Sequence, residues 1–451
     1  MSNARFLSGS LRKHILVMTG TSALGLMATF LTDILTLLYV AKLHDPGALA
    51  IVGLAKTLLF LNGSLVSAVV MAAGALISQR AGRGATRGLP SLISSALLLT
   101  LITTTAIAVL ELACLEWVTG WLGAGAIADK IGARHFITMM VGCSLLACVG
   151  QLSAQALRGV GLSRAAMVVV LSGAATLAVA DPLCIFVLKL GLSGAALAYG
   201  IAMAVAAGMG LYQLQRHVGL DLRLRTRRVS LHSRSIVRTA LPWALANLAT
   251  PVSVGTLLSQ LATHGVSAMA GMAVVDRVLQ IAYCFYFALP GALVPVFSQL
   301  VGAGDPHRTR RAIRLALMIT LGYGLAVWAV LVVLGQPIAD HFGVADAGEA
   351  VVLAACRYGA GLWVLIGLDF VALSLFISIG RPWWVVLYAW VRATLGTFPF
   401  VWLGERLDGA AGVILGPWAG NALIALVAIS GASIATARYF RRTPQQTRVL
   451  S

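Results

Sequence analysis

The sequence predicts an all-helical membrane protein of twelve transmembrane helices, built as two homologous halves of six. Three observations support this fold class. Of the 451 residues, 59% are hydrophobic and only 11% are charged, which is more apolar surface than a water-soluble core of this length can bury. Long apolar segments recur along the chain, and its second half repeats its first. Lysine and arginine gather in alternate loops, as they do in membrane proteins.

The predicted helices are apolar runs long enough to cross a bilayer, which takes roughly 20 residues of helix. In order they lie at roughly 14–42, 48–78, 90–116, 134–157, 165–188, 193–215, 238–263, 268–300, 312–336, 352–379, 383–403 and 411–437. Several runs exceed the required length, so tilted or bent helices are expected. Prolines within or next to the runs offer places to bend: Pro182, Pro242, Pro251, Pro290, Pro295, Pro399 and Pro417.

The repeat appears as matching segments at an offset of about 220 residues. Residues 45–51 and 77–84 resemble residues 265–271 and 297–304. Two shorter matches follow in the same order, 157–161 with 376–380 and 191–194 with 409–412. Many secondary transporters are built from such repeats.

The basic residues indicate which loops face the cytoplasm, because lysine and arginine are retained on that side. If the N-terminus lies inside, 24 of the 33 lysines and arginines fall in inner segments and five in outer ones. We therefore expect both termini in the cytoplasm and a location in the bacterial inner membrane. Topology then explains the net charge of +18 without a nucleic-acid partner. The alternative is a nucleic-acid-binding segment at Leu222–Arg238.

The predicted organisation is an N-terminal lobe at 1–215, a basic cytoplasmic linker at 216–238 and a C-terminal lobe at 239–451 that ends in a short basic tail. No polar stretch is long enough to fold as a soluble domain, and no phosphate loop of an ATP-driven pump occurs. The spans hold no His/Glu metal set and no Ser/Lys nucleophile pair, so we expect neither an enzyme nor a bound metal or cofactor. All six cysteines lie in apolar runs and are expected to be free thiols: Cys114, Cys143, Cys148, Cys184, Cys284 and Cys356.

Several motifs together resemble the multidrug and toxic compound extrusion (MATE) family of transporters, in particular its DNA-damage-inducible (DinF-like) branch. The resemblance extends from about Leu11 to Ala437, and its motifs occur in order and in duplicate. They are Asp33, Tyr39–Ala50, Ser78–Gly84, Leu157–Gly161, Asp181–Leu183, Gly191–Ala198, Leu241–Asn247 and Ser298–Gly304. The resemblance implies two six-helix bundles around a central cleft, related by a pseudo-two-fold axis along the membrane normal. An even number of spans per half agrees, because it leaves both halves in the same orientation.

Three aspartates lie well inside apolar spans: Asp33, Asp181 and Asp369. An ionised carboxylate there costs on the order of 3 kcal/mol by insertion scales, so it faces a cavity or a partner. Because protonation removes the charge, each aspartate is a candidate ion carrier. The alternative is a fixed ion pair of Asp33 with Lys56, or of Asp369 with Arg392, since each basic residue lies on an adjacent span. None of the three acids has an acidic counterpart in the other repeat, which favours a specific task over a scaffold role.

The resemblance assigns roles to two of these acids. Asp33 and Asp181 are similar to the paired acids of the N-terminal lobe in proton- or cation-coupled MATE transporters. This chain departs from the pattern at two neighbouring positions, where Leu177 replaces an asparagine and Tyr199 replaces a threonine. Sodium needs several oxygen ligands at short range, so these replacements favour protons as the coupling ion.

Asp369 is similar to the tenth-helix acid of the norfloxacin-exporter branch of the same family. That branch also uses a glutamate on helix seven, where this chain has Asn247, Thr250 and Ser253. Sodium coupling in the C-terminal lobe is therefore not favoured, although backbone carbonyls at kinked helices can replace side-chain ligands.

Polar and aromatic residues inside the spans are candidates for lining a substrate cleft. The candidates are Lys56, Asn62, Gln151, Gln155, Tyr199, Asn247, Gln260, Tyr283, Tyr286 and Arg392. The two tyrosines would stack on a flat organic cation. Hydrogen bonds between helices are the alternative for the polar residues, and lipid contact is the alternative for the aromatic ones.

The resemblance implies a secondary antiporter that exports amphipathic, cationic or zwitterionic organic compounds in exchange for protons, with Asp33 as the primary carrier and Asp181 as its partner. Asp369 would be a second coupling site or a substrate counter-ion. The expected partners are a small organic substrate and membrane lipids, and the expected state is a monomer. The alternatives are sodium coupling, a receptor or scaffold without a transport cycle, and a flippase for a lipid or lipid-linked oligosaccharide. A flippase would use Lys56, Arg277 and Arg392 to hold a phosphate.

Overall fold

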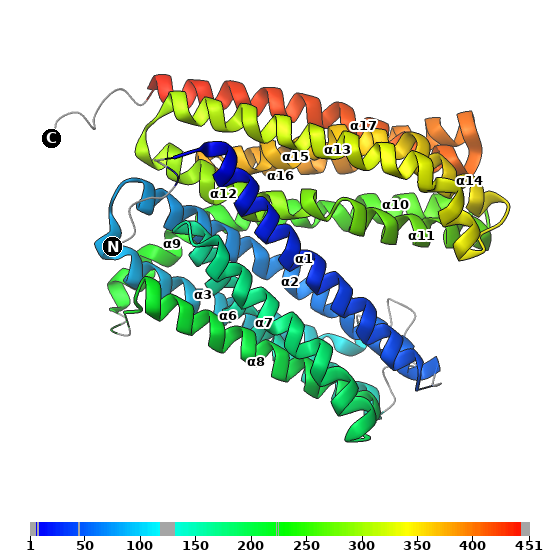
Figure 1. The fold of residues 1–451 in the computed structure, drawn as a ribbon, viewed down its shortest axis with the longest axis horizontal. Coiled ribbons are helices and arrows are strands. Elements are labelled where there is room, and N and C mark those ends of the chain that lie inside the picture. Colours follow the sequence, from blue (N-terminus) through cyan, green and yellow to red (C-terminus); the bar gives the residue numbers. More distant parts are fainter. Residues whose placement is uncertain are drawn as a thin grey trace. The chain divides into compact units, whose positions relative to one another are not determined.

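The computed structural model describes Phe6 and residues 9–43, 46–117, 131–221, 223 and 225–442, which form helices and no strand (Figure 1). Contacts divide the chain into two compact units. The N-terminal unit contains the described residues from Leu24 to Ala240, and the C-terminal unit contains Phe6 to Ala23 and the chain from Leu241 onward. The first turns of the first helix thus pack with the second half of the chain, whereas the sequence analysis places residues 1–215 in one lobe.

The helices of the N-terminal unit follow the predicted spans closely. In order they are α1 (Leu11–Ala41), α2 (Pro46–Gly82), the short η2 (Thr86–Gly88), α3 (Leu89–Ala113), α6 (Ile131–Gly159), α7 (Ser163–Pro182), the π-helical η3 (Leu183–Val187), α8 (Gly191–His217) and α9 (Thr226–Asn247). The first half of α1 and the end of α9 belong to the other unit.

The core of the N-terminal unit is organised around α6, which packs along α2, α3, α7 and α8 (Figure 1). Small residues allow these helices to approach closely. A side chain at Gly194 on α8 would collide with the backbone of Cys184, and one at Gly210 would collide with Ser153 on α6. Two apolar clusters fill the interior, one around Leu92 and Leu152 and the other around Leu58.

The predicted linker at 216–238 is largely helical. After α8 ends at His217, α9 begins at Thr226, and its His232 lies 3.2 Å from the Arg80 guanidinium and 3.1 Å from the Ser95 hydroxyl. These contacts fix the start of α9 to α2 and α3 of the N-terminal unit.

The C-terminal unit contains the remaining helices. They are α10 (Ala249–Ala262), α11 (Val266–Ala282), α12 (Cys284–Ala303), α13 (Pro306–Phe342), α14 (Ala347–Ala354), the π-helical η4 (Ala355–Gly359), α15 (Ala360–Ser378), α16 (Trp383–Thr394) and α17 (Phe398–Arg442). Here α15 packs along α12, α13 and α17. The predicted span 268–300 is broken at Tyr283 into α11 and α12, which have a non-helical junction.

The long element α17 is two helices joined at a kink, because Asp408 and Gly409 have non-helical dihedral angles. A side chain at Gly404 would collide with the backbone of Gly412, so only glycine lets the two helices pack this closely. Eleven segments of the described chain are long and apolar enough to cross a membrane, and the segment Pro382–Arg441 contains this kink. Counted as two, it brings the number of crossings to twelve, which confirms the predicted fold class.

The repeat is visible in the local structure as well as in the sequence. The two Ser-Gln motifs lie near the ends of α2 and α12, and each is followed by a glycine with positive φ. Gly84 has φ of 73° and Gly304 has φ of 70°, a conformation that glycine adopts without steric cost at helix ends.

Candidate functional site

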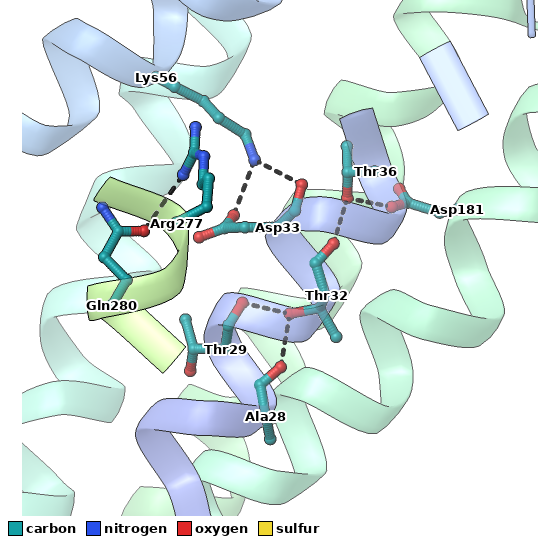
Figure 2. Close-up of polar contacts among 9 residues, drawn as sticks. All are labelled: Ala28, Thr29, Thr32, Asp33, Thr36, Lys56, Asp181, Arg277 and Gln280. Atoms are coloured by element: carbon teal, nitrogen blue, oxygen red, sulfur yellow. Dashed lines mark hydrogen bonds and ion pairs between the residues drawn. The ribbon is translucent and has the colours of Figure 1, made fainter. Parts of the chain in front are cut away.

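The first predicted acid, Asp33, forms an ion pair with Lys56. The Lys56 ammonium on α2 lies 2.8 Å from the Asp33 carboxylate on α1 and donates a second hydrogen bond of 3.2 Å to the Asp33 backbone carbonyl (Figure 2). The Asp33 side chain is 51% exposed and that of Lys56 is 26% exposed. This contact is the ion pair predicted from the sequence as the alternative to an ion-carrying role of Asp33.

Among the described residues, the second acid, Asp181, has no cation in hydrogen-bond contact. Its side chain is 1% exposed, and its Oδ2 accepts a hydrogen bond from the Thr36 hydroxyl on α1 (Figure 2). The other carboxylate oxygen, Oδ1, is buried without a hydrogen-bond partner in the part of the chain that the structure describes. An ionised carboxylate in apolar surroundings needs partners for both oxygens, so this geometry suits the neutral acid better than the anion.

The Thr36 hydroxyl can serve both protonation states of Asp181. Its oxygen lies 3.0 Å from the backbone carbonyl of Thr32, one turn earlier on α1. A hydroxyl has one hydrogen and two lone pairs. When Asp181 is ionised, the hydroxyl donates to the carboxylate. When Asp181 is protonated, the hydroxyl accepts the acid proton and donates to Thr32. A proton is therefore gained or lost without leaving Thr36 unpaired.

The helices place these groups together through local spacing. Asp33 and Thr36 are three residues apart on α1 and so lie on the same side of the helix. Asp181 is the second-last residue of α7, followed by Pro182 and the π-helix η3. Proline removes a helical hydrogen bond, and π-helical turns occur often at functional sites.

The wall beside Asp181 is apolar and offers few ligands for a metal cation. Leu177, Ala180 and Cys184 form a buried cluster with Ala198 and Ala202 of α8. Tyr199, the residue that replaces the family's threonine, is half-buried and packs against this cluster. The described part of the chain contains no group of three or more His, Cys, Asp or Glu residues that would hold a metal ion.

In the C-terminal unit, Asp369 is ion-paired with Arg392. Asp369 lies on α15 and Arg392 on α16, and a guanidinium nitrogen donates directly to the carboxylate. The Asp369 side chain is only 16% exposed, so this pair is more buried than that of Asp33 with Lys56. The observed contact is again the ion pair that the sequence analysis gives as an alternative.

The two tyrosines proposed to stack on a substrate lie in the packed interior of the C-terminal unit. Tyr283 and Tyr286 are fully buried. Their hydroxyls donate to the backbone carbonyls of Ala360 at 2.7 Å and Thr320 at 2.9 Å. In this conformation both rings are engaged within the protein, and Tyr283 stacks on Trp363.

The polar cleft candidates of the N-terminal unit divide into paired and exposed side chains. Asn62 is buried and donates a hydrogen bond of 3.1 Å to Glu111. Gln155 is buried and accepts a hydrogen bond of 3.4 Å from Arg158, while its Nε2 has no partner. Gln151, one turn earlier on α6, is exposed.

The remaining polar residues of interest in the C-terminal unit lie on α9, α10 and α11. Gln260 donates a hydrogen bond of 2.7 Å to Glu405, which also lies 3.2 Å from the His264 imidazole. Asn247 is half-buried at the end of α9. Arg277, the third cation of the flippase hypothesis, is exposed and donates a hydrogen bond of 3.2 Å to Gln280 (Figure 2).

Sequence reasoning did not single out Thr36, Glu111 or Glu405. A census of every acid within or beside the predicted spans would have found Glu111, because it lies inside the run 90–116. Thr36 is harder to identify from the sequence, because threonines are common in membrane helices. Only its spacing of three residues from Asp33 distinguishes it.

Comparison with known proteins assigns the family. The MatE family model matches residues 22–183 and residues 242–403, one match in each repeat. The chain therefore belongs to the MatE family, whose members are multi-pass membrane transporters.

Individual relatives and solved structures agree with this assignment. The chain is 38% identical to an uncharacterized 21 kDa protein of Pseudomonas savastanoi over 51% of this chain and 76% of that protein. It is 25% identical to an FAD transporter of Shewanella oneidensis over 78% of this chain and 80% of that protein. The fold is similar to a mutant of the MATE transporter VcmN from Vibrio cholerae, with a TM-score of 0.90, 20% identity and coverage of 95% of this chain and 98% of that one. At that identity the structural likeness concerns the fold alone.

Proposed function

We propose that this protein is a proton-coupled antiporter that exports amphipathic cationic or zwitterionic organic compounds, as multidrug transporters do. The observation that supports proton coupling is the environment of Asp181. This carboxylic acid is fully buried and accepts a hydrogen bond from one neutral donor, and among the described residues its second oxygen has no hydrogen-bond partner. A proton bound there neutralises the buried carboxylate, and its release creates a buried anion that the surroundings stabilise poorly. Binding and release therefore favour different conformations of the helices around Asp181.

In this proposal Asp33 and Asp181 act together, in the manner of the DinF-like branch. Thr36 and Asp33 lie one turn apart on α1, so a change at Asp181 is transmitted through Thr36 to the helix that carries the ion pair of Asp33 and Lys56. Asp33 as the primary carrier remains a prediction from the resemblance. In the present conformation Asp181 is the better proton acceptor, because protonation of Asp33 would leave Lys56 without its counter-charge.

The driving force is adequate for export. A proton that enters across 100 mV supplies roughly 2.3 kcal/mol, and one unit of pH gradient adds about 1.4 kcal/mol. One proton per cycle therefore sustains a gradient of a neutral substrate on the order of a few hundredfold. We propose the bacterial inner membrane as the location, with both termini in the cytoplasm.

The flippase alternative is less favoured by the ion pairs. A phosphate-binding cleft needs cations that are not already neutralised, yet Lys56 and Arg392 each have a carboxylate partner. The similarity to an FAD transporter supports a second candidate substrate, a flavin nucleotide, whose phosphates would have to compete with those carboxylates.

Efflux from proteoliposomes tests the proposal. Ethidium efflux is measured under an imposed proton gradient and then under a sodium gradient, for the unaltered protein and for Asp181→Asn. We expect efflux under the proton gradient only, and its loss in Asp181→Asn. Efflux driven by sodium would overturn the coupling. Movement of FAD but not ethidium would replace the cationic substrate with the flavin nucleotide.

A further inference from the structure

A second buried carboxyl group in the N-terminal unit has the same unbalanced hydrogen bonding as Asp181. Glu111 lies on α3, two residues before the end of this helix, and its side chain is 6% exposed. The Asn62 amide on α2 donates to its Oε2 at 3.1 Å. Its Oε1 is buried and has no hydrogen-bond partner among the described residues.

The surroundings of Glu111 are apolar. Two of its neighbours in the sequence, Ala108 on α3 and Leu115 just after it, belong to a buried cluster with Leu58 of α2 and with Phe136 and Met140 of α6. An ionised carboxylate in such surroundings, with one oxygen lacking a hydrogen bond, is strongly disfavoured. The conformation therefore suits a protonated Glu111.

The basic residues of α2 and α6, the two long helices that pack against α3, already have other partners. On α2, Lys56 is paired with Asp33 and Arg80 contacts His232. On α6, Arg134 is paired with Glu116 at 3.2 Å, and Arg158 donates to Gln155. Among the described residues, none of these cations is positioned to hold Glu111 as an anion.

The other titratable groups on these helices are weak partners. They are His135, which is exposed near the start of α6, and the thiols of Cys143 and Cys148 on the same helix. Neutral thiols are poor hydrogen-bond donors, so they do not replace a cation as a partner for the anion.

We propose that Glu111, positioned by Asn62, is a second proton-binding group of this protein, separate from Asp33 and Asp181. Its role in transport rests on the proposed function, because a second proton per cycle has meaning only in a proton-coupled transporter. The position of Glu111 supports entry of the proton from one particular face of the membrane. The helix α3 begins beside Arg87, which lies in a basic loop, and Glu111 lies at the other end of this helix. The proton would therefore enter from the face opposite that loop.

The geometry also connects Glu111 to the first site. Asn62 and Lys56 are six residues apart on α2, or about 9 Å along the helix axis. Lys56 holds Asp33 on α1, and Thr36 on α1 holds Asp181 on α7. Protonation of Glu111 would therefore act on the helix that carries the partner of Asp33.

Infrared difference spectroscopy tests Glu111 without any transport assay. Spectra of the full-length protein in lipid are recorded at acidic and alkaline pH, and the stretching bands of protonated carboxyl groups are compared among variants. We expect Glu111→Gln to lose one such band, together with one proton of the uptake measured in a pH jump. In the matched control, Glu116→Gln, the exposed acid five residues further along is changed, and the Glu111 band should remain. In Asn62→Ala the band should shift to higher frequency, because a hydrogen bond to the carboxyl group is removed.

The outcomes separate this inference from the proposed function. Identical spectra for Glu111→Gln and the unaltered protein would overturn it, and so would displacement of the band by sodium at constant pH, which would indicate a cation site. If Glu111→Gln does not fold, the shift in Asn62→Ala decides the question. A failure of proton-driven efflux in the unaltered protein, with the Glu111 band present, would overturn the proposed function and leave Glu111 as a proton-binding group without a role in coupling.

Discussion

The intramembrane aspartates of the two units have opposite kinds of hydrogen-bond partner. In the C-terminal unit, Asp369 has a guanidinium partner in Arg392. In the N-terminal unit, Asp181 is more deeply buried, yet its partner among the described residues is the neutral hydroxyl of Thr36. Burial alone therefore does not identify a proton carrier. A buried acid with a cation is held in one charge state, because protonation would leave that cation unpaired, whereas an acid with a neutral partner can change its charge state at smaller cost.

The strongest test of this comparison removes the carboxyl group of Asp181. Asp181→Asn should reduce proton-driven efflux at least about tenfold, equivalent to about 1.4 kcal/mol, because an amide cannot bind and release a proton. Initial efflux rates from proteoliposomes, normalised to the amount of inserted protein, provide the measurement. The matched control is Asp340→Asn near the exposed end of α13, which should transport normally. If Asp181→Asn also transports normally, Asp181 is not the carrier.

Removing the cation of the C-terminal pair should mainly affect stability. Arg392→Ala leaves Asp369 without its counter-charge in a partly buried site, so we expect the free energy of unfolding to fall by about 1–3 kcal/mol. The double variant Arg392→Met with Asp369→Leu should recover most of that loss, since two apolar side chains leave no charge unpaired. Thermal unfolding in detergent measures both effects. A double variant less stable than the single one would show that the pair contributes more than charge compensation.

Removing the Thr36 hydroxyl should change the pH dependence of transport. In Thr36→Val the ionised form of Asp181 loses its only hydrogen-bond donor, so the proton is retained to higher pH. A hydrogen bond to a charged group contributes about 1.5–3 kcal/mol, and one pH unit corresponds to 1.36 kcal/mol. We therefore expect the pH of half-maximal efflux to rise by about one to two units. Thr36→Ser restores the hydroxyl and should restore the profile, whereas a fall in this pH would contradict the role assigned to Thr36.

The smallest effect is expected at the more exposed pair. Lys56→Met removes the partner of Asp33, whose side chain is half exposed and can be solvated by water. Exposed ion pairs contribute less than about 1 kcal/mol, so the stability of Lys56→Met should differ from that of the unaltered protein by no more than this. The same thermal unfolding measurement gives the comparison with Arg392→Ala. An equal loss in both variants would mean that the two units hold their ion pairs with similar strength.

Much of the fold was predictable from local patterns. The twelve crossings and the glycine turns after both Ser-Gln motifs follow from residues close together in the sequence, and the duplication follows from comparing such short segments along the chain. The three intramembrane aspartates were found because acids are rare in apolar runs. The break at Tyr283 was not predicted, since no proline or glycine adjoins this residue and the junction depends on how α11 and α12 pack.

The sequence alone is sufficient to infer that this protein lies in a membrane and how often it crosses. It also shows which carboxyl groups are placed where a charge is costly. These properties follow from hydropathy and charge, because each membrane helix satisfies its backbone hydrogen bonds within its own segment. The packing of the helices in the tertiary structure determines which acids are paired with cations and which are hydrogen-bonded to neutral partners. Asp33 and Lys56 are 23 residues apart, Asn62 and Glu111 are 49 apart, and Thr36 and Asp181 are 145 apart. Such contacts depend on the rotation and packing of separate helices, which no local pattern specifies.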